Sequence, residues 1–267
     1  MYNYENELKH KLGSLSFIND IIYYSSVDST NTLAHKLAQN GYREWTIVVA
    51  DSQNKGKGRQ GRYWYSPPDV NIYTSFILKP DLSYRYIPSI SLLSGMVIGQ
   101  SIEYFTGFKV ELKWPNDVMV KGKKISGVLL ELGNLADGKP YVVVGIGINV
   151  NADVKYYPEH LSLTTTSMKA LTNNLYDRAD VLTYLYSLFQ KWYTIYCIND
   201  GFDSIKKEYM ERFNLLHKEI KIMDGVMEID GIVKDIDKYG RLVLEDKKGI
   251  LTYVNSGDVH LISKNER

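Results

Sequence analysis

The chain has 267 residues, of which 44% are hydrophobic and 24% are charged. This length can hold one sizeable core and a smaller second domain, and the composition excludes a disordered or collagen-like protein. The net charge of +1 excludes a strong overall attraction to nucleic acid or anionic membrane, although a local basic loop is present. Cys197 is the only cysteine, which excludes an intrachain disulfide and fits a reducing compartment.

The start of the chain and its apolar runs indicate the cellular compartment of the protein. Residues 1–13 are polar and lack the apolar core of a signal peptide. The longest apolar runs, such as residues 142–150, are far too short to span a bilayer. We therefore expect a cytoplasmic protein. The first twenty residues are too few for a helix-turn-helix domain, so we expect no nucleic-acid partner.

Strand and helix patterns alternate through the first three quarters of the chain. Apolar residues recur on one face of residues 31–41, which predicts a helix that Ser29 or Asp28 caps and Gly41 ends. Further helices are predicted at residues 88–105, 178–195 and 202–213. Runs of β-branched and aromatic residues predict strands at residues 21–24, 46–50, 109–113, 116–120, 125–132 and 141–149.

Turn signals predict hairpins in the second half of the chain. Residues 121–124 suit a hairpin turn, with Gly122 available for a positive φ. After about Leu216, short β-rich runs alternate with Asp-Gly, Tyr-Gly and Lys-Gly turns. This texture predicts a small, separate β-barrel at the C-terminal end.

A glycine-rich basic loop at residues 56–62 reads GKGRQGR. Its glycines expose backbone N–H groups, and Lys57, Arg59 and Arg62 concentrate positive charge, so the loop is suited to wrap a small anion. Trp64 adds a flat face on which a purine can stack. A solvated basic turn explains the same composition equally well. The loop is not a P-loop, because the GK-[ST] ending is missing.

Three further motifs are open to a structural and a functional interpretation. The motif KWPND begins at Lys113, and a lysine at a strand end either neutralises a carboxylate or phosphate or simply faces solvent. The motif GIGINVN contains Asn149 and indicates either a bound ligand or a crowded strand crossing. The motif DSTN at residues 28–31 is typical of a helix N-terminus, where exposed N–H groups can also hold a polar ligand group.

The motifs become specific in combination. In chain order the sequence reads DSTN, GKGRQGRYWYSP, KWPND, KISGVLLE and GIGINVN, and this series resembles the biotin–protein ligase family. The C-terminal segment GIVKDIDKYGRLVL resembles the small SH3-like domain of that family. The resemblance implies an α+β fold with a central mixed β-sheet flanked by helices, of the class II synthetase-like type. It implies a catalytic domain at residues 1–214 and an SH3-like β-barrel at residues 215–267.

The resemblance also implies site residues, substrates and partners. Biotin and ATP with Mg²⁺ are the expected substrates, no metal is held by the protein itself, and the acceptor is a lysine of a biotin carboxyl carrier domain. The implied biotin-binding residues are Ser29, Thr30, Asn31, Gln53, Lys57, Gly58, Arg59, Lys113 and Gly127. The implied nucleotide-binding residues are Arg62, Trp64 and Asn149. Lys113 and Arg59 are the expected catalytic residues, with Lys113 on the biotin carboxylate and then on the adenylate phosphate.

This sequence departs from the family in its glycine-rich loop. Many bacterial members read GRGRRGR, so Lys57 and Gln60 replace two arginines here. Lys57 keeps the charge but loses the bidentate fork of arginine, which puts the role of its side chain in doubt. We expect a monomer or a homodimer, since the family includes both.

Rival interpretations remain open on the sequence alone. A lipoate–protein ligase or octanoyl transferase shares the core fold by resemblance, and titration with biotin and with lipoate distinguishes them. A non-catalytic biotin sensor or transcription regulator is a second rival, which a filter-binding assay on genomic DNA fragments tests. A third is an interaction protein that docks partners through its C-terminal barrel.

Overall fold

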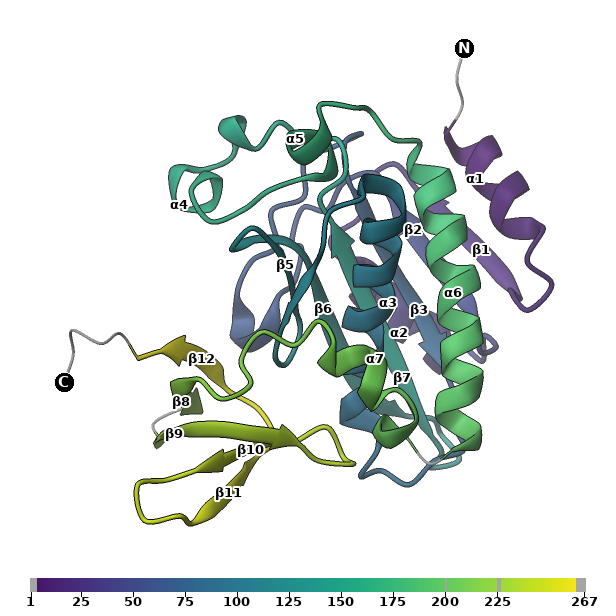
Figure 1. Cartoon of the computed structure of the whole chain (residues 1–267). Coiled ribbons are helices and arrows are strands. Elements are labelled where there is room, and N and C mark those ends of the chain that lie inside the picture. Colours follow the sequence, from purple (N-terminus) through teal and green to yellow (C-terminus); the bar gives the residue numbers. More distant parts are fainter. Residues whose placement is uncertain (1–3, 200, 225–226, 263–267) are drawn as a thin grey trace.

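The computed structural model describes residues 4–199, 201–224 and 227–262. It contains a seven-stranded sheet in the order β1-β2-β3-β7-β6-β5-β4 and a five-stranded sheet in the order β11-β10-β9-β8-β12 (Figure 1). The strands are β1 (Asp20–Tyr24), β2 (Thr46–Ala50), β3 (Ile72–Leu78), β4 (Glu111–Lys113), β5 (Asp117–Val120), β6 (Lys123–Asn134), β7 (Pro140–Ile148), β8 (Glu219–Asp224), β9 (Met227–Ile236), β10 (Leu242–Glu245), β11 (Leu251–Val254) and β12 (Asp258–Leu261). The α-helices are α1 (Tyr4–Gly13), α2 (Thr30–Gln39), α3 (Ile90–Thr106), α4 (Glu159–Ser162), α5 (Met168–Thr172), α6 (Arg178–Ile198) and α7 (Lys206–Met210). Short 3-10 helices are η1 (Arg59–Gly61), η2 (Ile87–Ser89), η3 (Val154–Tyr156) and η4 (Phe202–Ser204).

The large sheet is mixed, as predicted. β1 and β2 run parallel, and the other neighbouring strands of this sheet are antiparallel. All the predicted strands of this sheet are present, but β3 and α1 were not predicted. The prediction of one helix at residues 202–213 is wrong, because the chain forms η4 and α7 there with a break between them. The predicted boundary between residues 214 and 215 stays a prediction, and the described residues of the second sheet begin at Glu219.

Local sequence accounts for how several elements begin and end. The Ser29 side chain accepts a hydrogen bond from the Thr32 N–H and so caps α2, and Gly41 follows that helix at a φ of 86°. Gly107 ends α3 at a φ of 73°. In the turn between β5 and β6, Lys121 and Gly122 both have positive φ, which is the conformation that a two-residue hairpin requires.

The two faces of the large sheet are covered differently. On one face, Val142, Val144 and Ile146 of β7 belong to the main core, which α1, α3 and α6 complete (Figure 1). On the other face, Val143 packs against the alanines of α2 in a smaller cluster. The next residue of β7 on that face is Gly145, so α2 covers only one half of the face and a hollow remains over the other. None of the helices in the described part of the chain combines the length and apolar character that a bilayer crossing needs.

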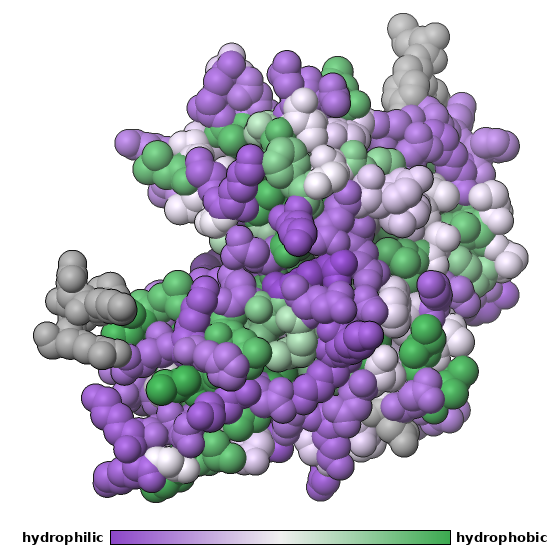
Figure 2. Space-filling view, viewed as in Figure 1, coloured by the Kyte–Doolittle hydropathy of each residue, from purple (hydrophilic) through white to green (hydrophobic). Residues whose placement is uncertain are grey.

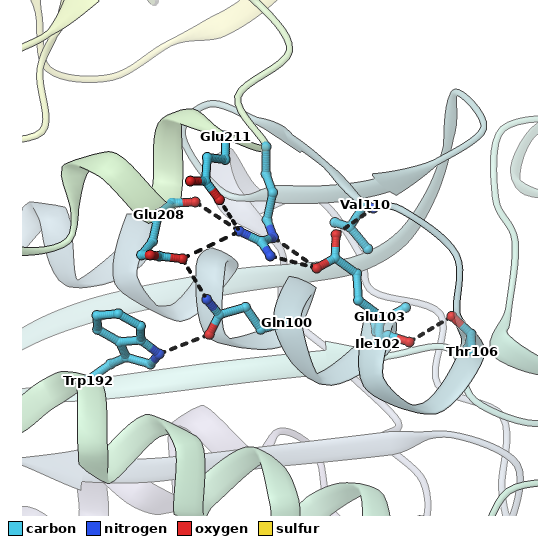
Figure 3. Close-up of polar contacts among 9 residues, drawn as sticks. Gln100, Ile102, Glu103, Thr106, Val110, Trp192, Glu208 and Glu211 are labelled. Carbon is cyan, nitrogen blue, oxygen red and sulfur yellow. Dashed lines mark hydrogen bonds and ion pairs between the residues drawn. The ribbon is translucent and has the colours of Figure 1, made fainter.

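An arginine holds the connection between the two sheets against the large domain. Arg212 donates from Nε and Nη2 to Glu103 Oε2 of α3, at 3.0 and 2.7 Å, and Figure 3 shows the surrounding partners on α3, α6 and α7. The backbone of the same segment pairs with β4, because the Leu112 N–H donates to the Arg212 carbonyl at 2.7 Å and the Asn214 N–H to the Leu112 carbonyl at 3.2 Å. The connecting segment therefore borders the short strand that carries Lys113.

The five-stranded sheet touches the large domain through a turn. The Tyr239-Gly240 turn between β9 and β10 presents the Gly240 carbonyl, which accepts a hydrogen bond from the buried Trp114 Nε1 at 3.0 Å. Gly240 has a φ of 80°, and a Cβ added to it would lie 2.5 Å from the Ser89 Cβ. No side chain therefore fits at position 240 unless Ser89 shifts.

We predict that Gly240→Ala lowers the free energy of unfolding more than Gly249→Ala does. Both glycines lie in hairpin turns at nearly the same φ, 80° and 79°, but a Cβ at Gly249 would meet nothing within 4 Å. Gly249→Ala should cost about 1–2 kcal/mol for the left-handed backbone alone. Gly240→Ala should cost about 1–3 kcal/mol more, because Ser89 must shift. Urea denaturation of the two variants measures the difference, and equal losses would contradict the tight contact.

Candidate functional site

A cavity of about 310 Å³ lies over the half of the sheet face that α2 leaves uncovered. Its volume is in the range of sites that bind small molecules. Figure 2 shows a notch between the lobe that carries α4 and the C-terminal sheet, and cavity-lining residues come from both sides of it, among them Leu161 and His260. All the residues selected from the sequence line this cavity: Ser29, Thr30, Asn31, Gln53, Lys57, Gly58, Arg59, Arg62, Trp64, Lys113, Gly127 and Asn149.

Three glycines on the central strands form the floor of the cavity. Gly127 of β6 pairs with Gly147 of β7, and Gly145 lies two residues before it on the same face. A Cβ on Gly145 would overlap the Asn31 side-chain oxygen, and one on Gly147 would lie 2.5 Å from the Trp64 indole. The sequence indicated a bound ligand or a crowded strand crossing at GIGINVN, and the space at these two glycines is taken by two side chains of the chain itself, Asn31 and Trp64. Each glycine gives room to one of them.

One end of the cavity carries a hydrogen-bonded polar cluster. The Gln53 Oε1 accepts from the Thr30 backbone N–H at 2.9 Å and lies 3.1 Å from the Thr30 hydroxyl. The Gln53 Nε2 donates to the Ser66 hydroxyl at 3.0 Å, which fixes the direction of the Gln53 amide. The Ser29 hydroxyl oxygen accepts the capping hydrogen bond of α2, and its hydrogen has no acceptor among the described residues. Ser29 therefore offers a donor at this end.

Asn31 lies in the same polar cluster and is almost completely buried. Its Nδ2 donates to the Leu129 carbonyl at 3.2 Å and to Glu131 Oε2 at 2.7 Å, while its Oδ1 accepts from the Ser75 hydroxyl at 2.6 Å. An amide oxygen has two lone pairs, so Oδ1 keeps one acceptor position for a ligand. This end of the cavity thus combines acceptors with a hydroxyl donor.

The Glu131 carboxylate beside this cluster is held ionised. The His35 imidazole, whose Nε2 lies 3.6 Å from Glu131 Oε2, lowers the pKa of this carboxyl to about 2. The Asn31 amide and the Lys57 charge act in the same direction, against the opposing effect of burial. Glu131 therefore accepts hydrogen bonds, and does not donate them, at any pH near neutrality.

Positive charge gathers at the other end of the cavity. Arg59 Nη1 donates to the Asn116 Oδ1 of KWPND at 3.2 Å, and Arg62 Nη2 lies 2.6 Å from Asp258 Oδ1 of β12. The two arginines thus tie the glycine-rich loop to two different walls. The Arg62 side chain is 59% exposed, so its ion pair is weak and easily exchanged. Within the described ranges, the Lys113 ammonium has no hydrogen-bond or ion-pair partner.

Sequence reasoning missed a third lysine that lines this cavity, Lys124. Lys124 Nζ lies 2.6 Å from Asp117 Oδ1 and 5.3 Å from the centre of the Trp64 ring. Lys113 is the strand partner of Asp117, so both lysines belong to the same corner. The motif KISGVLLE begins at Lys124, which is also the last residue of the predicted turn at residues 121–124, and the turn interpretation concealed this lysine near the start of β6. Asp258 was also missed, since no local pattern links β12 to the glycine-rich loop.

The two residues expected at a nucleotide base differ in how much bonding capacity they keep. The Trp64 Nε1 is buried and has no acceptor among the described residues, so it is an unused donor. Asn149 is buried, and its Nδ2 donates to the Thr166 carbonyl at 3.1 Å, while its Oδ1 accepts from the Tyr157 hydroxyl at 3.3 Å and from Asn71 Nδ2 at 3.4 Å. Asn149 therefore keeps one N–H, which is less than the sequence suggested. Their role in nucleotide binding stays a prediction.

The depressed pKa of Glu131 predicts how acid affects stability. A carboxyl whose pKa falls from 4.5 to about 2 on folding contributes stability that is fully present above about pH 5 and is lost as the pH falls toward 2. The difference in unfolding free energy between the wild type and Glu131→Gln should therefore be constant from pH 5 to 7 and shrink below pH 4.5. Urea denaturation across this range measures it. A difference that does not change with pH would contradict the ionic contacts of Glu131.

Comparisons with known proteins agree with this arrangement. Residues 23–151 match the model of the biotin/lipoate A/B protein ligase family, and residues 216–261 match that of the biotin protein ligase C-terminal domain. The bifunctional ligase/repressor BirA of Bacillus spizizenii is 34% identical over 260 residues, which cover 96% of this chain and 78% of that protein. The biotin–[acetyl-CoA-carboxylase] ligase of Paracoccus denitrificans is 30% identical over 225 residues, which cover 83% of this chain and 92% of that one.

A solved structure extends the similarity to three dimensions. The biotin protein ligase from Aquifex aeolicus in complex with biotin and ATP superposes with a TM-score of 0.78 at 30% sequence identity. The match covers 92% of this chain and 99% of that one, and so includes both sheets. The chain therefore belongs to the biotin protein ligase family.

Proposed function

We propose that this protein joins biotin to ATP, giving biotinyl-5′-adenylate and pyrophosphate, and then transfers biotin to a lysine of a carrier protein. The observation that supports this most is the sharing of one cavity by a polar cluster and a group of cations. A substrate with a polar ring at one end and a carboxylate at the other spans such a cavity from end to end.

The polar cluster matches the biotin ring system in its hydrogen-bonding pattern. The urea of biotin presents a carbonyl oxygen between two N–H groups. The Ser29 hydroxyl supplies a donor for that oxygen, and Thr30 Oγ1 and Asn31 Oδ1 supply acceptors for the N–H groups. A dithiolane ring or a plain acyl chain would leave the remaining donor and acceptor positions of these buried groups unused, which disfavours lipoate or octanoate as the substrate.

The cationic corner matches the first chemical step. The biotin carboxylate must attack the α-phosphorus of ATP, so two anions have to approach each other, and fixed positive charges lower the cost of this approach. Lys113 is positioned at the end of β4 without a partner among the residues that the structure describes, and Arg59 and Arg62 reach the same cavity from the glycine-rich loop. Mg²⁺ enters as part of the ATP substrate. Trp64 and Asn149 are then left for the adenine.

The second step needs an acceptor and a protected intermediate. The neutral amine of the acceptor lysine attacks the mixed anhydride, and AMP leaves. The loop at residues 56–62, tied to both walls by Arg59 and Arg62, would keep water from the anhydride until then. We propose a biotin carboxyl carrier domain as the acceptor. We also propose that residues 1–214 form the catalytic domain, which binds this acceptor, and that residues 215–267 form an SH3-like domain beside it. A monomer or a homodimer and the lack of a nucleic-acid partner stay predictions.

One assay tests the proposed function. The purified chain is incubated with labelled biotin, ATP, Mg²⁺ and a biotin carboxyl carrier domain, and the label is then followed on the carrier. Transfer that requires ATP supports the proposal. Isothermal titration with biotin and with lipoate serves as a check on the substrate, and tighter binding of lipoate would overturn the choice of biotin.

We predict that Lys113→Ala slows adenylate formation by a factor of about 100 or more, because one fixed cation is lost where two anions meet. Pyrophosphate release measures this step. Lys124→Ala should slow it as well, since Asp117 is then left as an uncompensated anion at the cavity. Lys123→Ala is the matched control, because Lys123 is exposed on the same hairpin and does not line the cavity. A near-normal rate for Lys113→Ala would remove Lys113 from the mechanism and leave Lys124 as the partner of the carboxylate.

We further predict that the two glycines of GIGIN affect different substrates. Gly145→Ala displaces Asn31, so it should raise the KM for biotin at least tenfold with little change in the KM for ATP. Gly147→Ala displaces Trp64, so it should raise the KM for ATP and leave that for biotin nearly unchanged. Steady-state kinetics with each substrate varied in turn measures both. Equal effects of the two variants on both substrates would contradict the assignment of the two ends.

A further inference from the structure

Behind the polar end of the cavity, Glu131 of β6 contacts the buried side chain of Asn31. Glu131 Oε2 accepts from Asn31 Nδ2 at 2.7 Å, and this is the shorter of the two hydrogen bonds that Nδ2 makes. Glu131 does not line this cavity itself, and its hydrogen bond to Asn31 is its direct contact with a side chain that does, whereas Lys57 of the cavity wall is affected only by its charge.

Counting donors and acceptors shows what this contact does. The Leu129 carbonyl and the Glu131 carboxylate can only accept, so both hydrogens of Asn31 Nδ2 point to them and Oδ1 must face the opposite way. The partner on that side, the Ser75 hydroxyl, can donate or accept and would tolerate either orientation of the amide. The orientation of Asn31 is therefore decided by its two acceptors, and Glu131 is the one that a side-chain substitution can remove.

Glu131 is in turn held from its other side. His35 Nε2 lies 3.6 Å from Glu131 Oε2, and His35 Nδ1 lies 3.0 Å from the Tyr141 hydroxyl. A Cβ on Gly133 would overlap the Tyr141 ring, so this glycine gives the tyrosine its room. The contacts form a continuous series from Tyr141 through His35 and Glu131 to Asn31, outside the cavity wall.

We propose that Glu131 is a positioning residue for ligand choice: it turns the Asn31 amide so that the oxygen faces the cavity and selects a ring with an N–H at that place. The inference rests on the proposed use of biotin, and it goes further by assigning the choice of the urea to a residue that never touches it. Without an acceptor at position 131, only the longer hydrogen bond to the Leu129 carbonyl holds the amide, so the amide can turn over and present an N–H to an N–H of the ligand.

The test compares Glu131→Met, which removes the acceptor, with Glu131→Gln, which keeps a carbonyl oxygen at the same reach. Isothermal titration of the full chain with biotin should show a dissociation constant at least about tenfold higher for the Met variant, since a buried donor loses its partner, and within about threefold of the wild type for the Gln variant. The dissociation constant for desthiobiotin, which keeps the urea but not the sulfur ring, should rise by the same factor. The KM for ATP should change less than twofold. Glu131→Val, suited to a strand, replaces the Met variant if that one does not fold.

A double-mutant cycle separates positioning from a general loss of structure. If Glu131 acts through Asn31, Glu131→Met should weaken biotin binding no further in an Asn31→Ala background. Losses that multiply, or a Met variant that binds biotin as tightly as the wild type does, would overturn the inference. Biotin and desthiobiotin losses that differ would overturn it too, because the effect would then not act on the urea. Failure of the wild type to bind biotin would instead overturn the proposed function, so the two failures are distinguishable.

Discussion

The absence of three side chains from the centre of the sheet is the constraint on which the site depends. Gly127, Gly145 and Gly147 are brought together by the register of β6 and β7, and a slip of one residue would place Gly127 on the opposite face from the other two. Because their Cβ positions are empty, Asn31 and Trp64 can lie flat on the sheet. The apolar packing of α2 against Val143 stops where the glycines begin, so the smaller apolar cluster and the cavity share one face of the same strands.

The cavity holds its cations with counter-ions from its own walls. Asp117 pairs with Lys124, which is kept in place before any anion arrives, whereas the exposed pair of Asp258 with Arg62 is weak and easily exchanged. Charges that are fixed in advance need little reorganisation when substrate charge develops near them. Lys113 differs, since no carboxylate in the described part of the chain neutralises it. This corner of the cavity thus combines Lys124 and Arg62, which are paired with carboxylates, with Lys113, which keeps its full attraction for an anion.

Much of the fold and the lining of the cavity could be predicted from the sequence, for physical reasons. β2 has the predicted bounds, because five apolar and β-branched residues stand between clear breaks. β3 was missed because Thr74 and Ser75 interrupt its apolar run while all seven of its residues are buried, so neither a continuous apolar run nor an alternation marks it as a strand. The selected residues share one cavity because the motifs that carry them meet over the same face of the large sheet. Asp258 could not be found this way, since it lies outside these motifs and only the fold brings it to Arg62. Glu131 closes the motif KISGVLLE, but only the fold brings it to Asn31.

The pairing between the chain's connecting segment and β4 has a consequence for dissecting this protein. β4 is an edge strand of three residues, and its outer side is covered by the backbone at Arg212 and Asn214. A fragment cut before Arg212 would leave that edge bare, and exposed edges recruit other strands and promote aggregation. The catalytic half should therefore be expressed with its connecting segment retained, even where the second sheet is removed. The connecting segment is therefore a structural part of the large domain.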